Sequence, residues 1–155
     1  MTGKTPTTLS LSLPDEAATA ALGVRLASVA VPGDCVLLSG PIGAGKSTLA
    51  RAFIRARCGE REEVPSPTFT LVQVYEDGVA EIWHADLYRL THPDEVWELG
   101  LDDAFNRAIC LVEWPDRLGK HVPEGALHLA LEADGEGRRA VIRGGRASLR
   151  EAAHG

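Results

Sequence analysis

The sequence predicts an α/β fold in which a mostly parallel central sheet carries antiparallel strands at its edges. Two short runs, residues 35–38 and 109–112, are apolar at every position, which is typical of strands buried on both faces of a parallel sheet. Segments of helical periodicity alternate with strand-like segments, as in βαβ units. Two turn sequences rich in glycine and acids lie between strand-like runs, and they predict the antiparallel hairpins.

The first half of the chain is expected to run strand, helix, strand, helix. Residues 7–13 alternate polar and apolar side chains, as a half-buried strand does. The Pro-Asp-Glu sequence at 14–16 begins a helix, because proline and acids favour a helix N-terminus, and leucines and alanines give this helix a buried stripe. The apolar strand 35–38 follows, and a second helix is expected over 46–58.

The second half is expected to open with a hairpin, since the strand-like runs 69–75 and 79–85 flank a Glu-Asp-Gly turn. Two short helices are expected between 93 and 107, before the apolar strand 109–112. A second hairpin is expected within 126–142, around an Asp-Gly-Glu-Gly turn. The apolar side chains that the short helices are expected to direct inward are Val96, Trp97, Leu99, Leu101 and Phe105.

Length and composition indicate one ordinary globular domain. The chain has 155 residues, of which 45% are hydrophobic and 25% charged, and no repeat or Gly/Ser linker divides it. We therefore expect a single domain over 1–155, with flexible ends at 1–6 and 145–155.

Charge, hydropathy and cysteine spacing exclude several classes of protein. The net charge of −6 argues against a broad nucleic-acid-binding face. No apolar run approaches the ~20 residues that span a bilayer, and the first residues lack the apolar stretch of a secretory signal. The three cysteines are far apart, which argues against a disulfide framework or a zinc site. We expect a cytoplasmic protein that binds neither membrane nor DNA.

A glycine-rich turn between the strand 35–38 and the helix 46–58 fits the pattern G-x-x-x-x-G-K-S/T in full. Its residues are Gly40, Pro41, Ile42, Gly43, Ala44, Gly45, Lys46 and Ser47. Glycines let the backbone curl so that successive N–H groups face an anion, and the helix N-terminus adds to the positive field.

This pattern, in its strand–loop–helix setting, predicts a P-loop NTPase with three layers, α/β/α, and not a chance glycine-rich loop. Lys46 is expected to reach the β- and γ-phosphates, the Ser47 hydroxyl to ligate Mg²⁺, and Thr48 to donate to the α-phosphate. The chain has no guanine-reading N-K-x-D segment, which favours ATP.

Two acids follow strand-like runs, where a magnesium–nucleotide site needs a carboxylate. Asp86 follows residues 82–85 and Glu113 follows 109–112. Either one alone is equally compatible with an acid that caps a helix or faces solvent. Beside a P-loop, at least one is expected to serve the metal and the other to orient the attacking water. The residues leave open which acid has which role.

A Ser-Pro-Thr-Phe segment at 66–69 lies where P-loop switch proteins sense the γ-phosphate. Thr68 has a hydroxyl for the metal or the γ-phosphate, but an ordinary two-proline connection is an equally good interpretation. His84 is expected to be a buried core residue, and Trp114 to serve packing.

Two charged clusters have solvated surface as their default interpretation. The first cluster is an acidic stretch. The second makes the C-terminal part of the chain basic, and its alternative interpretation is contact with a nucleotide, a partner or RNA. Their members are Asp94, Glu95, Glu98, Asp102 and Asp103, and Arg138, Arg139, Arg143, Arg146 and Arg150.

Six motifs in order resemble one family across residues 9–142. They are TAALG at 19–23, GAGKSTL at 43–49, VPSPTFTLV at 64–72, HADLYRL at 84–90, LG at 99–100 and LVEWP at 111–115. Together they resemble the TsaE family, the small P-loop ATPases of bacterial tRNA threonylcarbamoyladenosine biosynthesis. The chain departs from the usual family pattern at Pro41-Ile42, where Asp-Leu is common, and at Ser47, where Thr is common.

The resemblance implies a weak Mg²⁺-dependent ATPase whose nucleotide lies along residues 43–48. It implies that Ser47 and Glu113 hold Mg²⁺, that Asp86 and Thr68 lie close to the γ-phosphate, and that Glu16 lies near the nucleotide base. It also implies partnership with TsaD and TsaB, whose complex the ATPase resets between turnovers. Such a protein meets tRNA only indirectly, and the acidic stretch 94–103 then becomes a candidate docking surface.

Two other functions stay open at this point. The first is a small-molecule or nucleotide kinase, although no insertion for an arginine-bearing lid is evident. The second is a nucleotide-dependent binding module that does not hydrolyse ATP.

Overall fold

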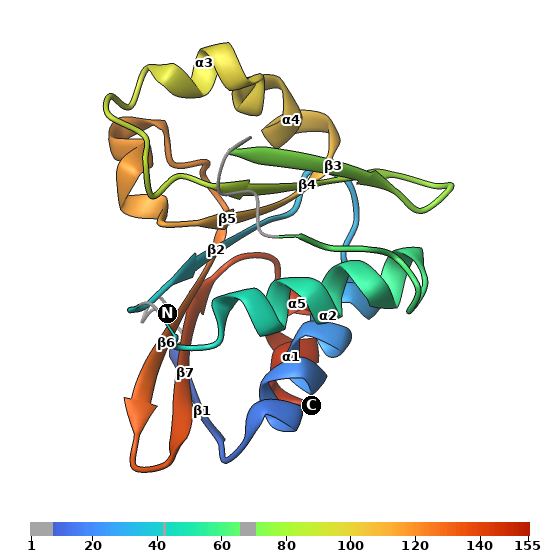
Figure 1. Ribbon diagram of the computed structural model, residues 1–155, viewed down its shortest axis with the longest axis vertical. Helices are drawn as coiled ribbons and strands as arrows, with labels where there is room; N and C mark the ends of the chain where they lie inside the picture. The colour runs from blue at the N-terminus through green and yellow to red at the C-terminus, as the bar shows by residue number, and fades with distance from the viewer. Residues whose placement is uncertain (1–7, 42, 66–70) are drawn as a thin grey trace, which may run out of the picture.

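The computed structural model describes residues 8–41, 43–65 and 71–155. Within these residues the chain forms a mixed seven-stranded sheet in the order β1-β7-β6-β2-β5-β4-β3 (Figure 1). The strands are β1 (Thr8–Leu13), β2 (Cys35–Ser39), β3 (Val72–Glu76), β4 (Glu81–Asp86), β5 (Ile109–Glu113), β6 (Leu127–Asp134) and β7 (Gly137–Gly144). The helices are α1 (Glu16–Val29), α2 (Lys46–Cys58), α3 (Glu95–Leu99), α4 (Leu101–Arg107) and α5 (Ala147–His154), with a 3₁₀ segment η1 (Pro115–His121).

The centre of the sheet is parallel and its edges are antiparallel, as the sequence predicts. Strands β6, β2, β5 and β4 pair in parallel, while β3 pairs antiparallel with β4, and β7 pairs antiparallel with both β6 and β1. The carboxyl ends of the four parallel strands therefore meet at one edge of the sheet, where ligands bind in open α/β sheets.

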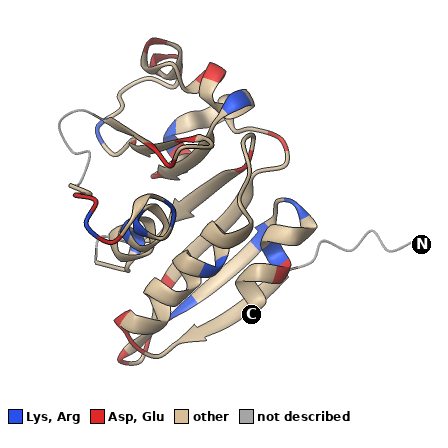
Figure 2. Cartoon of the chain, turned by 90° about the vertical axis from the view of Figure 1, so that its right-hand side faces the viewer, with Lys and Arg blue, Asp and Glu red and all other residues tan. Residues whose placement is uncertain are grey.

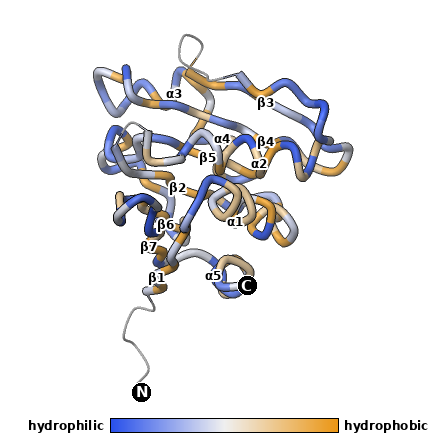
Figure 3. Tube along the Cα trace, turned by 60° about the horizontal axis from the view of Figure 1, so that its bottom comes forward, coloured by the Kyte–Doolittle hydropathy of each residue, from blue (hydrophilic) through white to orange (hydrophobic). Residues whose placement is uncertain are grey.

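Helices cover both faces of the parallel strands, which explains why β2 and β5 are apolar at every position. Val36 and Leu111 pack into a core shared with α1, α2 and α5. Leu37 and Val112, whose side chains alternate to the other face, pack into a second core with α3 and α4. The hydropathy colouring of Figure 3 shows apolar segments along the strands between these helices.

The helices α1 and α2 lie unusually close together, and a glycine allows the contact. A Cβ on Gly23 of α1 would lie 2.5 Å from the backbone oxygen of Leu49 in α2, so a larger residue would push the helices apart. Leu22 and Leu26 of α1 are fully buried beside this contact.

The two short helices are present, but their apolar faces are less buried than expected. Val96 and Leu101 are fully buried, whereas Leu99 and Phe105 are half-buried. The ring of Trp97 is 51% exposed and packs edge-on against His121, with ring centroids 4.6 Å apart. The expectation that Trp97 points inward is wrong, because helices of five and seven residues have room for only a narrow buried stripe.

The C-terminal residues differ from the expected flexible end over 145–155, since α5 packs against α1. Leu149 and Ala153 are buried, and the Arg25 guanidinium donates to the carbonyls of Ala152 and Ala153 at 3.2 and 3.0 Å. An eight-residue helix is marginal in isolation, so these tertiary contacts decide its formation. The expected flexible end at 1–6 lies outside the described residues.

The arginines near the C-terminus, coloured blue in Figure 2, are used within the fold. Arg146 forms a bidentate ion pair with Asp34, in which the Nε–Oδ1 and Nη2–Oδ2 distances are both 2.8 Å. The hydrogen bonds that Arg146 donates to Asp34, together with the negative charge of Asp34, raise the pKa of Arg146. Arg139 pairs with Asp134 at 3.1 Å, and Arg150 donates to the carbonyl of Gly144 at 3.1 Å.

The acidic stretch 94–103 is also partly engaged inside the chain. Asp94 pairs with His121 at 2.7 Å, and Glu95 accepts from the Thr91 hydroxyl at 2.6 Å. Asp103 pairs with Arg107. No helix in the described part of the chain is long and apolar enough to cross a membrane.

We expect Leu149→Ala to lower the free energy of unfolding by about 3 kcal/mol, because it removes a buried side chain between α5 and the rest of the fold. The exposed Glu151→Ala in the same helix is the control and should change stability by less than about 0.5 kcal/mol. Urea unfolding measures both. Equal stability of the two variants would contradict the packing of α5.

Candidate functional site

The glycine-rich loop joins β2 to α2 at the carboxyl edge of the sheet, and its geometry requires glycine. Gly40 has φ of +136°, and a Cβ there would lie 2.3 Å from the carbonyl oxygen of Leu131. Gly45 is the N-cap of α2 with φ of +107° and supplies no side-chain cap. The first N–H groups of α2 therefore lack a capping side chain, which leaves them available to an anion.

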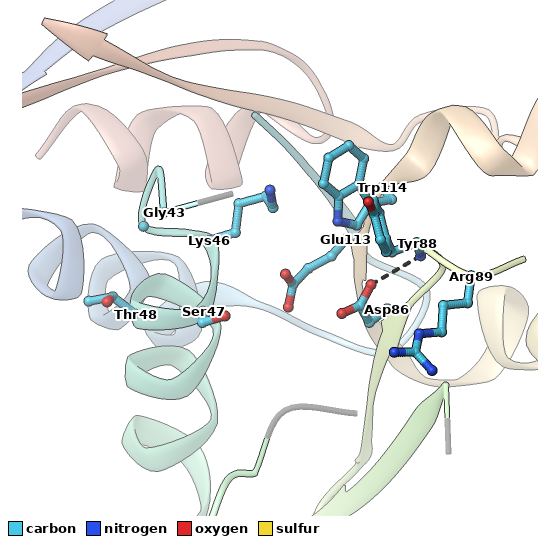
Figure 4. A pocket seen from close by; sticks show the side chains of 10 residues that line it. Gly43, Lys46, Ser47, Thr48, Asp86, Tyr88, Arg89, Glu113 and Trp114 are labelled. Carbon is cyan, nitrogen blue, oxygen red and sulfur yellow. Dashed lines mark hydrogen bonds between the residues drawn. The ribbon is translucent and has the colours of Figure 1, made fainter. Parts of the chain in front are cut away.

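A cleft of about 400 Å³ lies beside this loop (Figure 4). One wall is the start of α2, and the opposite wall is formed by residues at and just beyond the carboxyl ends of β4 and β5. The lining residues are Gly43, Gly45, Lys46, Ser47, Thr48, Asp86, Tyr88, Arg89, Glu113 and Trp114. The cleft thus brings together most of the site residues that the sequence predicts.

Asp86 and Glu113 are placed side by side by strand register. They are the last residues of β4 and β5, and they are paired with each other in the parallel ladder. Burial raises the pKa of Asp86, and the negative charge of Glu113 raises it further. A hydrogen bond of 3.1 Å from the Tyr88 N–H lowers this pKa and partly offsets the rise. Two adjacent carboxylates in a half-buried cleft favour a cation between them and the loop.

Lys46 is buried beside these acids, with 6% of its surface exposed. Its Nζ donates to the carbonyl of Gly40 and, at 3.2 Å, to that of Pro41, and it lies 4.4 Å from the centroid of the Trp114 ring. Burial lowers the pKa of Lys46, and the charges of Glu113 and Asp86 oppose that shift. The ammonium group is thus held inside the cleft.

Glu113 has a buried partner that the sequence does not predict. The Nε2 of His84 lies 2.7 Å from Oε2 of Glu113, and the two residues are 3% and 4% exposed. The other ring nitrogen, Nδ1, is buried with no hydrogen-bond partner among the described residues. His84 is buried as expected, but it supports a site residue as well as the core. Its position two residues before Asp86 places it on the same face of β4 as that acid, but the contact with Glu113 also depends on the pairing of β4 with β5.

Aromatic rings form the outer wall of the cleft. Tyr88 and Trp114 lie with ring centroids 4.9 Å apart and planes tilted by 51°. Trp114 has φ of +60°, a left-handed conformation that a bulky residue rarely adopts. The expectation that Trp114 only serves packing is incomplete, because its ring also faces Lys46.

A second cavity, of about 230 Å³, lies on the other side of the loop. This cavity and the cleft are both lined by Gly43, Gly45 and Thr48. Glu16 lies at the start of α1, and its Oε1 accepts a hydrogen bond of 3.4 Å from the Thr48 hydroxyl. Glu16 is therefore adjacent to the loop. The remaining lining residues are Leu13, Asp15, Thr19, Ala44, Glu136, Gly137 and Arg138.

The donor set fits a divalent cation held together with phosphate. The described residues contain no group of three or more His, Cys, Asp or Glu side chains that would enclose a metal alone. Mg²⁺ in nucleotide sites needs only one or two protein ligands besides phosphate oxygens and water, and Ser47 and Glu113 line the same cleft. Thr68, the expected γ-phosphate sensor, lies outside the described residues.

We expect His84→Ala to lower the free energy of unfolding by about 3 kcal/mol, because it leaves the Glu113 carboxylate buried without a partner. Glu113→Gln keeps a hydrogen-bonding group opposite the imidazole and should cost about 1 kcal/mol or less. Chemical denaturation measures both variants. A wild-type stability for His84→Ala would show that this contact does not stabilise the fold.

Comparisons with known proteins agree on one family. The family described as "Threonylcarbamoyl adenosine biosynthesis protein TsaE" matches residues 13–141. A tRNA threonylcarbamoyladenosine biosynthesis protein TsaE of Rickettsia felis is 39% identical over 129 residues, covering 83% of this chain and 75% of that protein. The Bacillus subtilis TsaE is 37% identical over 124 residues, covering 79% and 77%.

A solved structure agrees with the fold as well. The crystal structure of Bacillus subtilis YdiB superposes with a TM-score of 0.76 at 25% identity, covering 98% of this chain and 95% of that one. The glycine-rich loop, the paired acids and the motifs around them all lie within the matched residues 13–141. The chain therefore belongs to the TsaE family of tRNA threonylcarbamoyladenosine biosynthesis proteins.

Proposed function

We propose that this protein binds ATP with Mg²⁺, hydrolyses it weakly on its own, and uses the cycle to reset a TsaD–TsaB complex between rounds of tRNA modification. The observation that carries the ATP site is the single cleft in which Lys46 and Ser47 face the paired carboxylates Asp86 and Glu113. Lys46 and the loop N–H groups suit phosphate oxygens, and the carboxylates suit a divalent cation that phosphate oxygens also bind.

Each residue has a part that follows from its position. The backbone N–H groups of 43–48 would bind the phosphates, Lys46 would exchange the loop carbonyls for phosphate oxygens, and the Ser47 hydroxyl and Glu113 would hold the metal. The bound metal supplies charge neutralisation at the β- and γ-phosphates.

Asp86 lies beside Glu113 and orients the attacking water. Its raised pKa suits a carboxylate that accepts a proton, and burial beside a second acid supplies the shift. Thr68 is proposed to contact the γ-phosphate, and Thr48 the α-phosphate. Glu16 is proposed to lie near the base, since its carboxylate borders the second cavity.

The proposal of TsaD and TsaB as partners rests on family resemblance and not on a surface of this chain. Family membership connects the protein to threonylcarbamoyladenosine formation. The net charge of −6 suits a protein that reaches tRNA through partner proteins. In the acidic stretch, Glu98 and Asp102 have no ion pair within the described residues, so they are the acids best placed to meet a partner.

We expect Lys46→Ala to weaken ATP binding at least about 100-fold, because it removes the cation that neutralises the phosphates. Fluorescence titration with a labelled ATP analogue measures the dissociation constant. Lys120→Ala, which removes a lysine outside the cleft, is the control and should bind as the wild type does. Equal affinity of the Lys46 variant and the wild type would refute the nucleotide site.

We expect TsaD and TsaB to stimulate phosphate release, and Glu113→Gln to reduce the stimulated rate about 100-fold or more while the variant stays folded. Released phosphate is measured in the reconstituted system, with γ-labelled ATP to follow where the phosphoryl group goes. Transfer to a small acceptor instead of water would indicate a kinase. No hydrolysis by the wild type, even with both partners, would indicate a binding module.

A further inference from the structure

A side chain from the far end of the sequence is anchored on the glycine-rich loop. Arg138, near the start of β7, donates from Nη2 to the carbonyl oxygen of Gly43 at 2.9 Å and from Nη1 to the carbonyl oxygen of Gly137 at 2.9 Å. Its guanidinium thus bridges the β6–β7 hairpin and the loop, and it borders the second cavity. The fork of an arginine suits this bridge, because it presents several N–H donors in a fixed plane.

Local sterics place little constraint on the peptide whose carbonyl Arg138 holds. Gly43 has φ of +85°, and a Cβ built there would meet no atom within 4 Å. Glycine populates such conformations and their alternatives with little difference in energy, so local sterics do not fix this peptide.

The orientation of that peptide decides what the loop presents to a ligand. In a trans peptide the carbonyl of Gly43 and the N–H of Ala44 point in opposite directions. Arg138 holds the carbonyl on the side of the hairpin, and the Ala44 N–H points across the loop to the carbonyl of Pro41, at 3.1 Å. That same carbonyl accepts from Lys46 at 3.2 Å. The Ala44 N–H therefore lies on the inner side of the turn, bonded to Pro41 in the ligand-free loop, and a bound phosphate would have to take it over from that carbonyl.

We propose that Arg138 is a positioning residue that keeps the Gly43–Ala44 peptide turned with its N–H toward the bound phosphates. This role rests on the proposed nucleotide site, and it makes a residue of the β6–β7 hairpin contribute to nucleotide affinity. Without Arg138 only the hydrogen bond from the Ala44 N–H to the Pro41 carbonyl holds the peptide, and an incoming phosphate competes for that same N–H, so the peptide rotates more readily and the loop loses an N–H donor for part of the time. Nucleotide affinity then falls, while the rate of a correctly bound complex stays the same.

The neighbouring arginine supplies a matched control. Arg139 follows directly on β7, so its side chain points to the opposite face of the sheet. It donates to the Ser10 hydroxyl at 2.8 Å and pairs with Asp134 at 3.1 Å, away from the loop. Arg139→Ala removes the same charge and the same side-chain length from the same strand, without touching the Gly43 carbonyl.

The test measures the affinity of a fluorescent ADP analogue with Mg²⁺ for the full chain and its variants. We expect Arg138→Ala to weaken binding about tenfold, Arg138→Lys to bind with intermediate affinity, and Arg139→Ala to stay within about twofold of the wild type. The loss in Arg138→Ala should persist at 0.5 M NaCl, because a positioning hydrogen bond is not screened as a direct attraction to phosphate is. With TsaD and TsaB present, KM should rise and kcat should not change.

Two further readouts separate the outcomes. In the ligand-free protein, the amide resonance of Ala44 should shift or broaden in Arg138→Ala and not in Arg139→Ala, with equal thermal midpoints. If Lys46→Ala abolishes binding while Arg138→Ala binds as the wild type does, this inference is overturned and the nucleotide site stands. If the wild type binds no nucleotide, the proposed nucleotide site is wrong. Separately, an Ala44 amide resonance that is unchanged in Arg138→Ala would overturn the positioning role. Equal losses in both arginine variants would also overturn it.

Discussion

The parallel pairing of β2, β5 and β4 is the constraint on which the rest of the site depends. Because these strands run in the same direction, their carboxyl ends meet at one edge, and the loop after β2 faces the acids that end β4 and β5. Register then sets Asp86 against Glu113 without any dedicated contact between them. The apolar character of these strands thus builds the core and positions the chemistry at the same time.

Much of this arrangement could be predicted from the sequence, because it depends on local patterns. The continuous apolar runs identified the central strands, the glycine-rich motif identified the loop before α2, and the position of Asp86 and Glu113 after strands identified the acids. The helix over 46–58 begins and ends at the predicted residues, since glycines stand at both of its ends.

The contacts between distant segments could not be predicted in the same way. The pairing of His84 with Glu113, and of Arg138 with the loop, needs the three-dimensional order of the strands, and periodicity along one segment does not contain that order. The packing of α5 was missed for the same reason, as its eight residues are helical only against α1. The ring contact of Trp97 with His121 likewise joins residues from two different elements.

The close approach of α1 and α2 at Gly23 has a mechanical consequence. With the Leu49 carbonyl only 2.5 Å from the place of a Cβ, the backbones of the two helices meet here with no side chain between them. The first turn of α2 carries Lys46 and Ser47, and the first turn of α1 carries Glu16. A side chain larger than glycine at position 23 would therefore shift the start of α2, and the loop that precedes it, relative to the start of α1.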